Sequence, residues 1–393
     1  MANLRAIAFA GKSGSKPGAA LRYWKETLVA YLYILPATVI LVTFHFFPIF
    51  YAFYISLFNW GLVKGSFVGA SNYAKAISSE DFWHALNVTV YYVLGAVPLS
   101  LGLGLCVAYL LFQKIRGRDF YRTFYFMPYV MSLVAAAMVW RWLYHPNYGF
   151  FNYLLSLLGI DKWLWLDESA GVLTLFLGHL GLPFKDGYFT DAAWTAAFNG
   201  AMGVAAVLLL LPARRRNPAA IVGLVVVGFC FFFGLVDSVL LGLPNTSAAK
   251  VPDPSLALVS VIIFSTWHHV GFDIVIFLAG LTGISPELYE AARIDGAGEW
   301  QIFRHITFPL LSPTTFFLMI ISTIGTFQAF NHIYIMTNGG PMGATRTLTM
   351  FIFQNFYEFT RVGYASALAF ILFFIILGLT IVQFRVVGRR VEY

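Results

Sequence analysis

Polar side chains recur at helical spacing within two stretches of this sequence that are otherwise apolar. Residues three or four positions apart share one side of a helix. Such groups are costly in lipid, so they face the interior of a helix bundle or a water-filled path. They offer hydrogen bonding to a polar solute, and the competing interpretation is hydrogen bonding that holds the helices together. The members are Ser265, His269 and Asp273 in the first stretch, and Gly325, Gln328 and either Asn331 or His332 in the second.

Catalytic chemistry has little support in the sequence. A membrane-embedded transferase would need paired carboxylates or a nucleophile with its base on a loop beside the membrane. The available pairs, Glu80-Asp81 and Asp167-Glu168, are adjacent in sequence and are typical of solvated loop charges. The chain is therefore not predicted to be an enzyme.

Nucleotide and metal chemistry are not expected either. A phosphate-binding loop requires a glycine five residues before its Gly-Lys-Ser, and Ala6 stands there before Gly11. His268 and His269 have no further ligands at fitting spacing, so no metal site is predicted. We expect no cofactor bound by this chain.

The composition places the chain in a membrane. Of its 393 residues 59% are hydrophobic and only 11% are charged, whereas a soluble domain carries about a quarter charged residues. The net charge of +7 does not indicate nucleic-acid binding, because the basic residues form short clusters between apolar runs.

Eight apolar stretches are long enough to cross a bilayer as helices, which need about 20 residues. The first contains Pro36 and Pro48 and is expected to be kinked or tilted. The stretches are Leu28–Leu57, Leu86–Phe112, Phe124–Leu143, Ala192–Ala213, Ala219–Leu243, Leu256–Leu281, Thr314–Met336 and Gly363–Phe384.

The distribution of lysine and arginine predicts the orientation. With both termini in the cytoplasm, 17 of the 25 basic residues lie on the cytoplasmic side, as the positive-inside rule requires. The predicted fold is an all-α integral membrane protein, with a six-span core plus an inserted transmembrane hairpin and about eight spans in total.

The predicted domain organisation depends on residues 168–252, which we interpret as an insert. We predict a cytoplasmic tail over residues 1–27, the first three core spans over 28–167, an insert over 168–252 and the last three core spans over 253–393. The insert holds two of the spans, joined by the basic turn Arg214–Arg216.

Residues 285–313 form a distinctive segment on the predicted cytoplasmic side. Ser285 suits an N-cap and Pro286 the first helical position, so a short helix is expected to begin there. Gly296 and Gly298 are expected to end it before a second helix. A helix, a glycine hinge and a second helix suit docking into a partner's groove, and an ordinary interfacial loop is the alternative.

This segment resembles the EAA loop of bacterial ABC-importer permeases. The matching residues are Glu290, Ala291, Ala292, Gly296, Ile306 and Pro309, and the sequence departs from the pattern only at Phe308. Much of the remaining chain outside the insert is similar to the maltose/trehalose/glycerol-phosphate type of sugar permease, including Thr337–Pro341 and Gly363–Ala369.

The resemblance implies a permease subunit in the bacterial inner membrane that imports a sugar, either a di- or oligosaccharide or a related polyol or sugar phosphate. It implies a second homologous permease, an ATPase dimer that uses ATP and docks on the EAA loop, and an extracytoplasmic solute-binding protein as partners. The solute path would then include Gln328, Asn331, Asp273 and His269. Trp267, Phe327 and Phe330 could supply aromatic faces beside them. An ion-coupled secondary transporter is the main alternative, although only Asp273 offers an intramembrane charge.

Overall fold

The computed structural model describes residues 17–113, 117–179, 184–185, 188–189, 254–386 and 388. Four helices in these residues are long and apolar enough to cross a membrane, and two bent pairs of helices bring the total to as many as six. The prediction of a helical membrane protein is therefore confirmed. The four long helices are Thr27–Ser56, Glu80–Phe112, Leu256–Thr282 and Val362–Arg385.

The elements before the insert belong to the first three predicted core spans. They are α2 (Pro17–Leu41), the π-helical turn η1 (Val42–Phe46), α3 (Phe47–Ser56), α4 (Ser71–Ile77), α5 (Glu80–Phe112), α6 (Arg118–Val130), α7 (Leu133–Leu143) and α8 (Phe150–Leu157). α9 (Val172–His179) lies near the start of the predicted insert.

The elements after it make up the rest of the core. They are α12 (Leu256–Thr282), α13 (Pro286–Ile294), α14 (Glu299–Ile302), η2 (Phe303–Thr307), α15 (Phe308–Leu310), α16 (Ser312–Phe327), α17 (Asn331–Thr337), α18 (Leu348–Phe353), η3 (Gln354–Glu358) and α19 (Val362–Val386).

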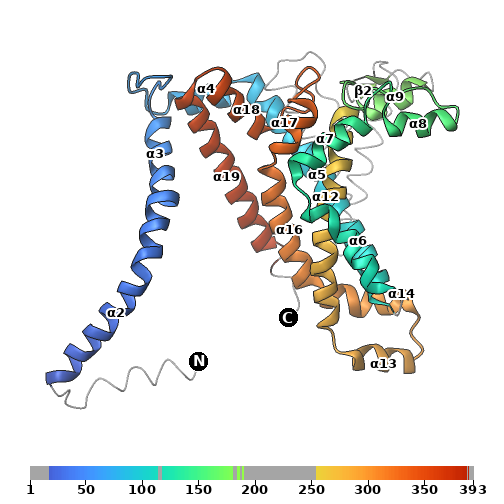
Figure 1. Ribbon diagram of the computed structural model, residues 1–393, viewed down its shortest axis with the longest axis horizontal. Coiled ribbons are helices and arrows are strands. Elements are labelled where there is room, and N and C mark those ends of the chain that lie inside the picture. The colour runs from blue at the N-terminus through green and yellow to red at the C-terminus, as the bar shows by residue number, and fades with distance from the viewer. Residues whose placement is uncertain are drawn as a thin grey trace, which may run out of the picture.

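The first span stands apart from the other helices. It stays helical through both prolines, with Pro36 inside α2, Pro48 in the first turn of α3 and the π-helical turn between them. None of its apolar span is buried, and Tyr33 is 84% exposed. It meets the bundle at its α3 end, where the rings of Phe53 and Phe370 lie 5.3 Å apart (Figure 1).

The predicted span Phe124–Leu143 is sharply bent. α6 and α7 meet at an angle of 95°, because Met131 adopts an extended conformation just after α6. Pro128 lies inside α6 and provides no N–H for a helical hydrogen bond. Apolar composition predicts that a segment enters the membrane, but it does not predict the direction of the segment.

The predicted span Thr314–Met336 is also interrupted. α16 ends at Phe327 and α17 begins at Asn331, so three residues separate the two helices. Thr349 Oγ1 donates a hydrogen bond of 2.5 Å to the carbonyl of Ala329 and so satisfies one of the exposed backbone groups. A break at membrane depth is tolerated where protein supplies such partners.

The centre of the bundle is the crossing of α5 and α12 (Figure 1). Small residues allow the close approach: a Cβ on Gly104 would lie 2.7 Å from the Cβ of Asp273. A Cβ on Gly271 would meet the backbone carbonyl of Tyr125 in α6. α12 is therefore held between α5 on one side and α6 on the other, which fixes the direction of its polar face.

The two ends of the predicted insert lie side by side. Val172 N–H donates to the Pro254 carbonyl at 3.1 Å, and Leu256 N–H donates to the Ala170 carbonyl at 3.0 Å. This is the arrangement that an insertion into a single loop requires. The insert is not purely helical, because β1 (Phe184–Lys185) and β2 (Tyr188–Phe189) pair as an antiparallel ribbon.

The predicted spans Ala192–Ala213 and Ala219–Leu243 lie outside the described residues.

Candidate functional site

A polar cavity of about 500 Å³ lies between α5, α6, α12, α16 and α17. Its size falls in the range typical of small-molecule sites. Hydroxyl, amide, imidazole and carboxyl groups line it together with aromatic rings. These groups belong to Tyr92, Ser100, Tyr129, Ser265, His269, Phe272, Asp273, Ser322, Thr326, Gln328, Phe330, Asn331 and His332.

The polar face predicted for α12 lines this cavity. Ser265, His269 and Asp273 all contribute to its wall, as their four-residue spacing predicted. Asp273 is only 1% exposed, whereas His269 is open to the cavity. The three residues therefore form one continuous polar strip along α12.

Hydrogen bonds from α5 fix the outer part of this strip. Tyr92 Oη donates to Ser265 Oγ at 2.7 Å, and the same hydroxyl lies 2.7 Å from His332 Nε2. Tyr92 thus joins α5 to both α12 and α17. Because its hydroxyl donates to Ser265, it accepts from His332, so Nε2 of that ring carries the proton.

The side chain of His269 has a defined tautomer by the same reasoning. Its Nδ1 lies 2.9 Å from the Ser265 carbonyl, which can only accept a hydrogen bond. Nδ1 therefore carries a proton, and Nε2 of the neutral ring remains as an acceptor. Asp273 is held by a hydrogen bond from Ser100 to its Oδ2.

The break between α16 and α17 presents two amides to the cavity. Gln328 caps α16 and Asn331 opens α17, and both side chains are exposed. The helix break places these two residues at the adjoining ends of α16 and α17. Here the predicted pair lies at one edge of the cavity, beside the ring of Phe330.

Aromatic faces come from residues other than the predicted Trp267. That indole packs against Trp140, with ring centroids 5.1 Å apart, and does not line the cavity. The rings of Tyr129 and Phe272 stack 5.1 Å apart in the cavity wall instead. Trp267 was predicted because it lies close in sequence to the polar strip of α12. It points to another side of that helix, however, and packs in the apolar core.

Several cavity residues were not predicted from the sequence, among them Tyr92 and Ser100 on α5 and Tyr129 on α6. A signal for the first two was present. Tyr92, Ala96 and Ser100 recur every four residues in an apolar span, which is the pattern used to predict the face of α12.

The second candidate site is the helical segment from Pro286 to Leu310, at the end of the bundle that carries α13 and α14 (Figure 1). The predicted helix, hinge and second helix are confirmed, with Pro286 in the first turn of α13. Gly296 adopts φ +80°, a conformation that non-glycine residues rarely adopt. Ser285 does not cap the helix backbone as expected, because its hydroxyl donates to the Glu287 carboxylate at 2.8 Å.

Two buried side chains anchor this segment to the bundle. Tyr289 is 8% exposed and Ile302 is 2% exposed, and both pack into an apolar cluster with α5 and α12. Thr307 donates a hydrogen bond of 3.3 Å to the Tyr289 hydroxyl. The six motif residues do not share one environment. Glu290, Ala291 and Gly296 are exposed, whereas Ala292, Ile306 and Pro309 are half-buried.

One exposed stripe along α13 is apolar. Leu288, Ala291 and Ile294 recur every three residues along it, and Ile294 is 86% exposed. Trp300 in α14 is also exposed, at 69%. Apolar side chains gathered in this way mark an interaction surface.

Within the described part of the chain, no group of three or more His, Cys, Asp or Glu side chains is arranged to hold a metal ion. Membrane-spanning helices around a polar cavity, with an exposed helical segment at one end, are typical of a membrane transport protein.

Comparison with known proteins identifies the family. Residues 100–392 match the family described as binding-protein-dependent transport system inner membrane component. The chain is 27% identical to the trehalose/maltose transport system permease protein of Thermococcus litoralis, over 93% of this chain and 95% of the relative. It is also 27% identical to an sn-glycerol-3-phosphate transport system permease protein of Rhizobium meliloti, over 93% of this chain and 97% of the relative.

A solved structure has a similar fold. It is a chain of a bacterial ABC transporter involved in the import of the acidic polysaccharide alginate, with a TM-score of 0.64 and 17% identity over 94% of this chain and 100% of the other. The protein belongs to the binding-protein-dependent transport system inner membrane component family. It is a multi-pass inner-membrane permease of an ABC transporter, whose ATPase is a separate subunit.

Proposed function

We propose that this permease carries a sugar, a di- or oligosaccharide or a related polyol, into the cytoplasm through the cavity between α5, α12 and α16. The observation that carries the proposal is the lining of that cavity. Free amides of Gln328 and Asn331 lie beside the rings of Tyr129, Phe272 and Phe330. Hydroxyl groups of a sugar need such donors and acceptors, and its C–H faces pack on aromatic rings.

The charge of the cavity favours an uncharged sugar over a sugar phosphate. Among the described residues that line it there is no lysine or arginine, and the one carboxyl group belongs to Asp273. A phosphate or carboxylate would enter without a counter-charge, which is costly away from water. The relatives named for glycerol phosphate and alginate carry anions, so we place the cargo of this chain with the neutral sugars of the trehalose/maltose permease.

The partners follow from the family and from the uncovered surfaces. We infer that the apolar stripe of α13, with Glu290 and Gly296, docks one subunit of an ATPase dimer that binds and hydrolyses ATP. The exposed first span is expected to pack on a second permease and on lipid. An extracytoplasmic solute-binding protein delivers the sugar, as in the related alginate transporter, whose structure includes a periplasmic protein.

Uptake into proteoliposomes tests the function. The complete importer should accumulate at least one of maltose, trehalose and maltotriose when ATP is supplied inside the vesicles with no ion gradient. Glycerol 3-phosphate and an alginate oligosaccharide should not be carried. Uptake that requires a sodium or proton gradient would favour the secondary-transport alternative, and ATP-driven uptake of the anions alone would contradict the choice of a neutral sugar.

The proposed topology has a six-span core, an inserted transmembrane hairpin and both termini in the cytoplasm. Arg214–Arg216 would then form a cytoplasmic turn. A cysteine placed at Asn217, in a background without Cys106 and Cys230, should resist a membrane-impermeant thiol reagent in intact cells and react after the cells are permeabilised. Labelling in intact cells would place the turn outside and contradict the eight-span arrangement.

A further inference from the structure

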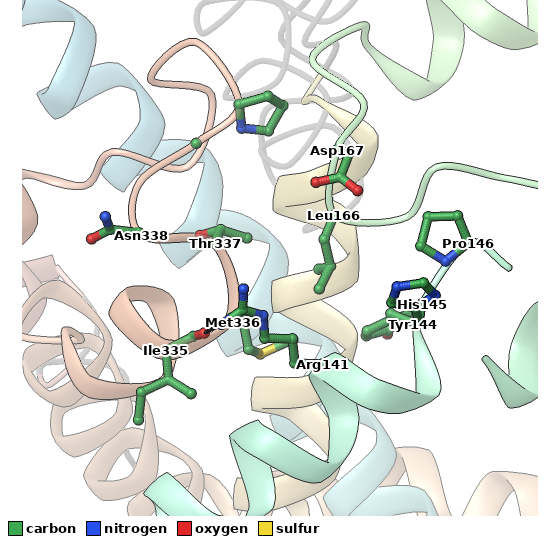
Figure 2. Close-up of a pocket in the computed structure, with 12 residues that line it drawn as sticks. Arg141, Tyr144, His145, Pro146, Leu166, Asp167, Ile335, Met336, Thr337 and Asn338 are labelled. Carbon is green, nitrogen blue, oxygen red and sulfur yellow. Dashed lines mark hydrogen bonds between the residues drawn. The ribbon is translucent and has the colours of Figure 1, made fainter. Parts of the chain in front are cut away.

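A second pocket, of about 340 Å³, lies at the end of the bundle opposite α13, and we call it the outer pocket. One wall is the end of α7 with the loop after it, and the other is the end of α17 with the loop after it (Figure 2). Leu166 and Asp167 close it from above in this view. The pocket is separate from the cavity described above and shares no lining residue with it.

Two opposite charges line the outer pocket without pairing. Arg141 donates one hydrogen bond, of 3.3 Å, from Nη1 to the Ile335 carbonyl, which ties its guanidinium to α17. Asp167 lies across the pocket from it (Figure 2). No ion pair joins the two side chains, although both belong to the described chain. The side chain of Arg141 therefore forms part of the wall of this pocket.

Asn338 lines the pocket on the side of α17. Its φ is +53°, and its backbone N–H donates to the carbonyls of Ile333 and Tyr334 at 3.1 and 3.0 Å, so the turn after α17 is well defined. The pocket therefore offers the donors of a guanidinium, the acceptors of a carboxylate and an amide that does both. Vicinal hydroxyl groups, which donate and accept at neighbouring atoms, match this combination, and the two charges leave no net preference for an ion.

α17 connects the outer pocket to the cavity. Asn331 and His332, at its start, line the cavity, and Ile335 to Asn338, at its end, line the outer pocket. His332 and Met336 are four residues apart, or about 6 Å along the helix, which is comparable to the length of one sugar unit. Met336 is 2% exposed and lines the outer pocket.

We propose that the outer pocket is a second sugar-binding site, in which Arg141, Asp167 and Asn338 hold one neutral sugar unit before it reaches the cavity. This inference rests on the proposed function, because it assigns the same class of cargo to both spaces. Contact with the solute-binding protein is the other use that a pocket at this surface could have, and the two uses differ in whether sugar alone occupies it.

Protection of a cysteine distinguishes these uses. His145→Cys places a thiol in the pocket wall, and Asn147→Cys places one in the same loop outside the pocket, both without Cys106 and Cys230. The complete importer is labelled in proteoliposomes with an impermeant maleimide, in the presence of maltose, trehalose or maltotriose. The sugar that the importer carries should slow labelling at position 145 and leave position 147 unchanged, with no binding protein present.

Asp167→Asn tests the assigned contact, and Asp161→Asn, an exposed carboxylate of the same loop, is its matched control. The half-protecting sugar concentration should rise about tenfold in Asp167→Asn, because a charge-assisted hydrogen bond becomes a neutral one, and should not change in Asp161→Asn.

If the importer carries a sugar but that sugar does not slow labelling at position 145, the second site is overturned and the proposed function stays intact. Slower labelling with the binding protein but not with sugar alone would have the same consequence. Equal half-protecting sugar concentrations in Asp167→Asn and Asp161→Asn would also overturn the second site. Absence of uptake for every sugar would overturn the proposed function, and the second site with it.

Discussion

Gly296→Asp is expected to lower sugar uptake by at least about tenfold while leaving the permease in the membrane. Gly296 has φ +80°, and an L-residue in this region costs about 1–3 kcal/mol. A Cβ there would meet no atom within 4 Å, so the cost arises in the backbone and not from a clash inside the chain. The substitution would also place bulk and a negative charge on the exposed surface that we assign to ATPase docking.

The matched control is Gly298→Asp. It adds the same side chain two residues away, but Gly298 has φ −73°, and it is the N-cap of α14, where aspartate is favoured. Gly296→Asn is a second control, because asparagine tolerates the left-handed region better than most residues. Both controls should retain most of the uptake.

The measurements are membrane content, co-purification of the ATPase and ATP-driven uptake. Normal co-purification together with normal uptake in Gly296→Asp would show that the segment from Pro286 to Leu310 is an ordinary interfacial loop. Loss of membrane content in Gly296→Asp alone would mean that the residue acts in folding, and the coupling role would then lose this support.

The helical segment from Pro286 to Leu310 was predictable because the residues that begin and end its helices lie within the segment itself. A proline and early carboxylates begin α13, and a glycine with positive φ ends it, so sequence and conformation are linked within a few residues. The exposure of Ala291 beside Leu288 and Ile294 also follows from helical periodicity once the helix is fixed.

The shape of the spans was less predictable because it depends on contacts between distant segments. The break between α16 and α17 is supported by Thr349, about 20 residues later, through its hydrogen bond to Ala329. Nothing near Ala329 in the sequence indicates that partner. The 95° bend after α6 has a local sign in Pro128, yet the same residue type leaves α5 continuous at Pro98.

Only part of the cavity was predictable, because the rest of it also depends on contacts between distant segments. Spacing identified the polar face of α12, and hydrogen bonds from Tyr92 and Ser100 on α5 hold that face in place. The wrong choice of Trp267 shows the limit of composition: an aromatic residue two positions from Ser265 lies on another side of the helix and packs on Trp140. Direction around a helix decides between a binding face and a core residue.

Gln328→Ala is expected to reduce sugar uptake by roughly 10- to 100-fold. The side chain of Gln328 is exposed in the cavity and forms no hydrogen bond with the residues that the structure describes. Its amide can therefore bind a solute. A sugar that fills the cavity would bury both its hydroxyl groups and this amide. Removal of one partner then leaves a buried hydroxyl unpaired, at a cost of about 1–3 kcal/mol.

The matched control is Gln354→Ala, which removes a half-buried amide of η3 that lies outside the cavity. Asn331→Ala tests the neighbouring amide, and because the two residues border the same space, the double variant should lose less than the sum of the single losses. Initial uptake rates are measured at equal permease content over a range of sugar concentrations. A fall in Gln328→Ala that matched a fall in protein level, or that equalled the fall in Gln354→Ala, would assign the amide to packing of the bundle. A specific loss in the two cavity variants, with normal assembly with the ATPase, is the result expected of residues that contact the sugar.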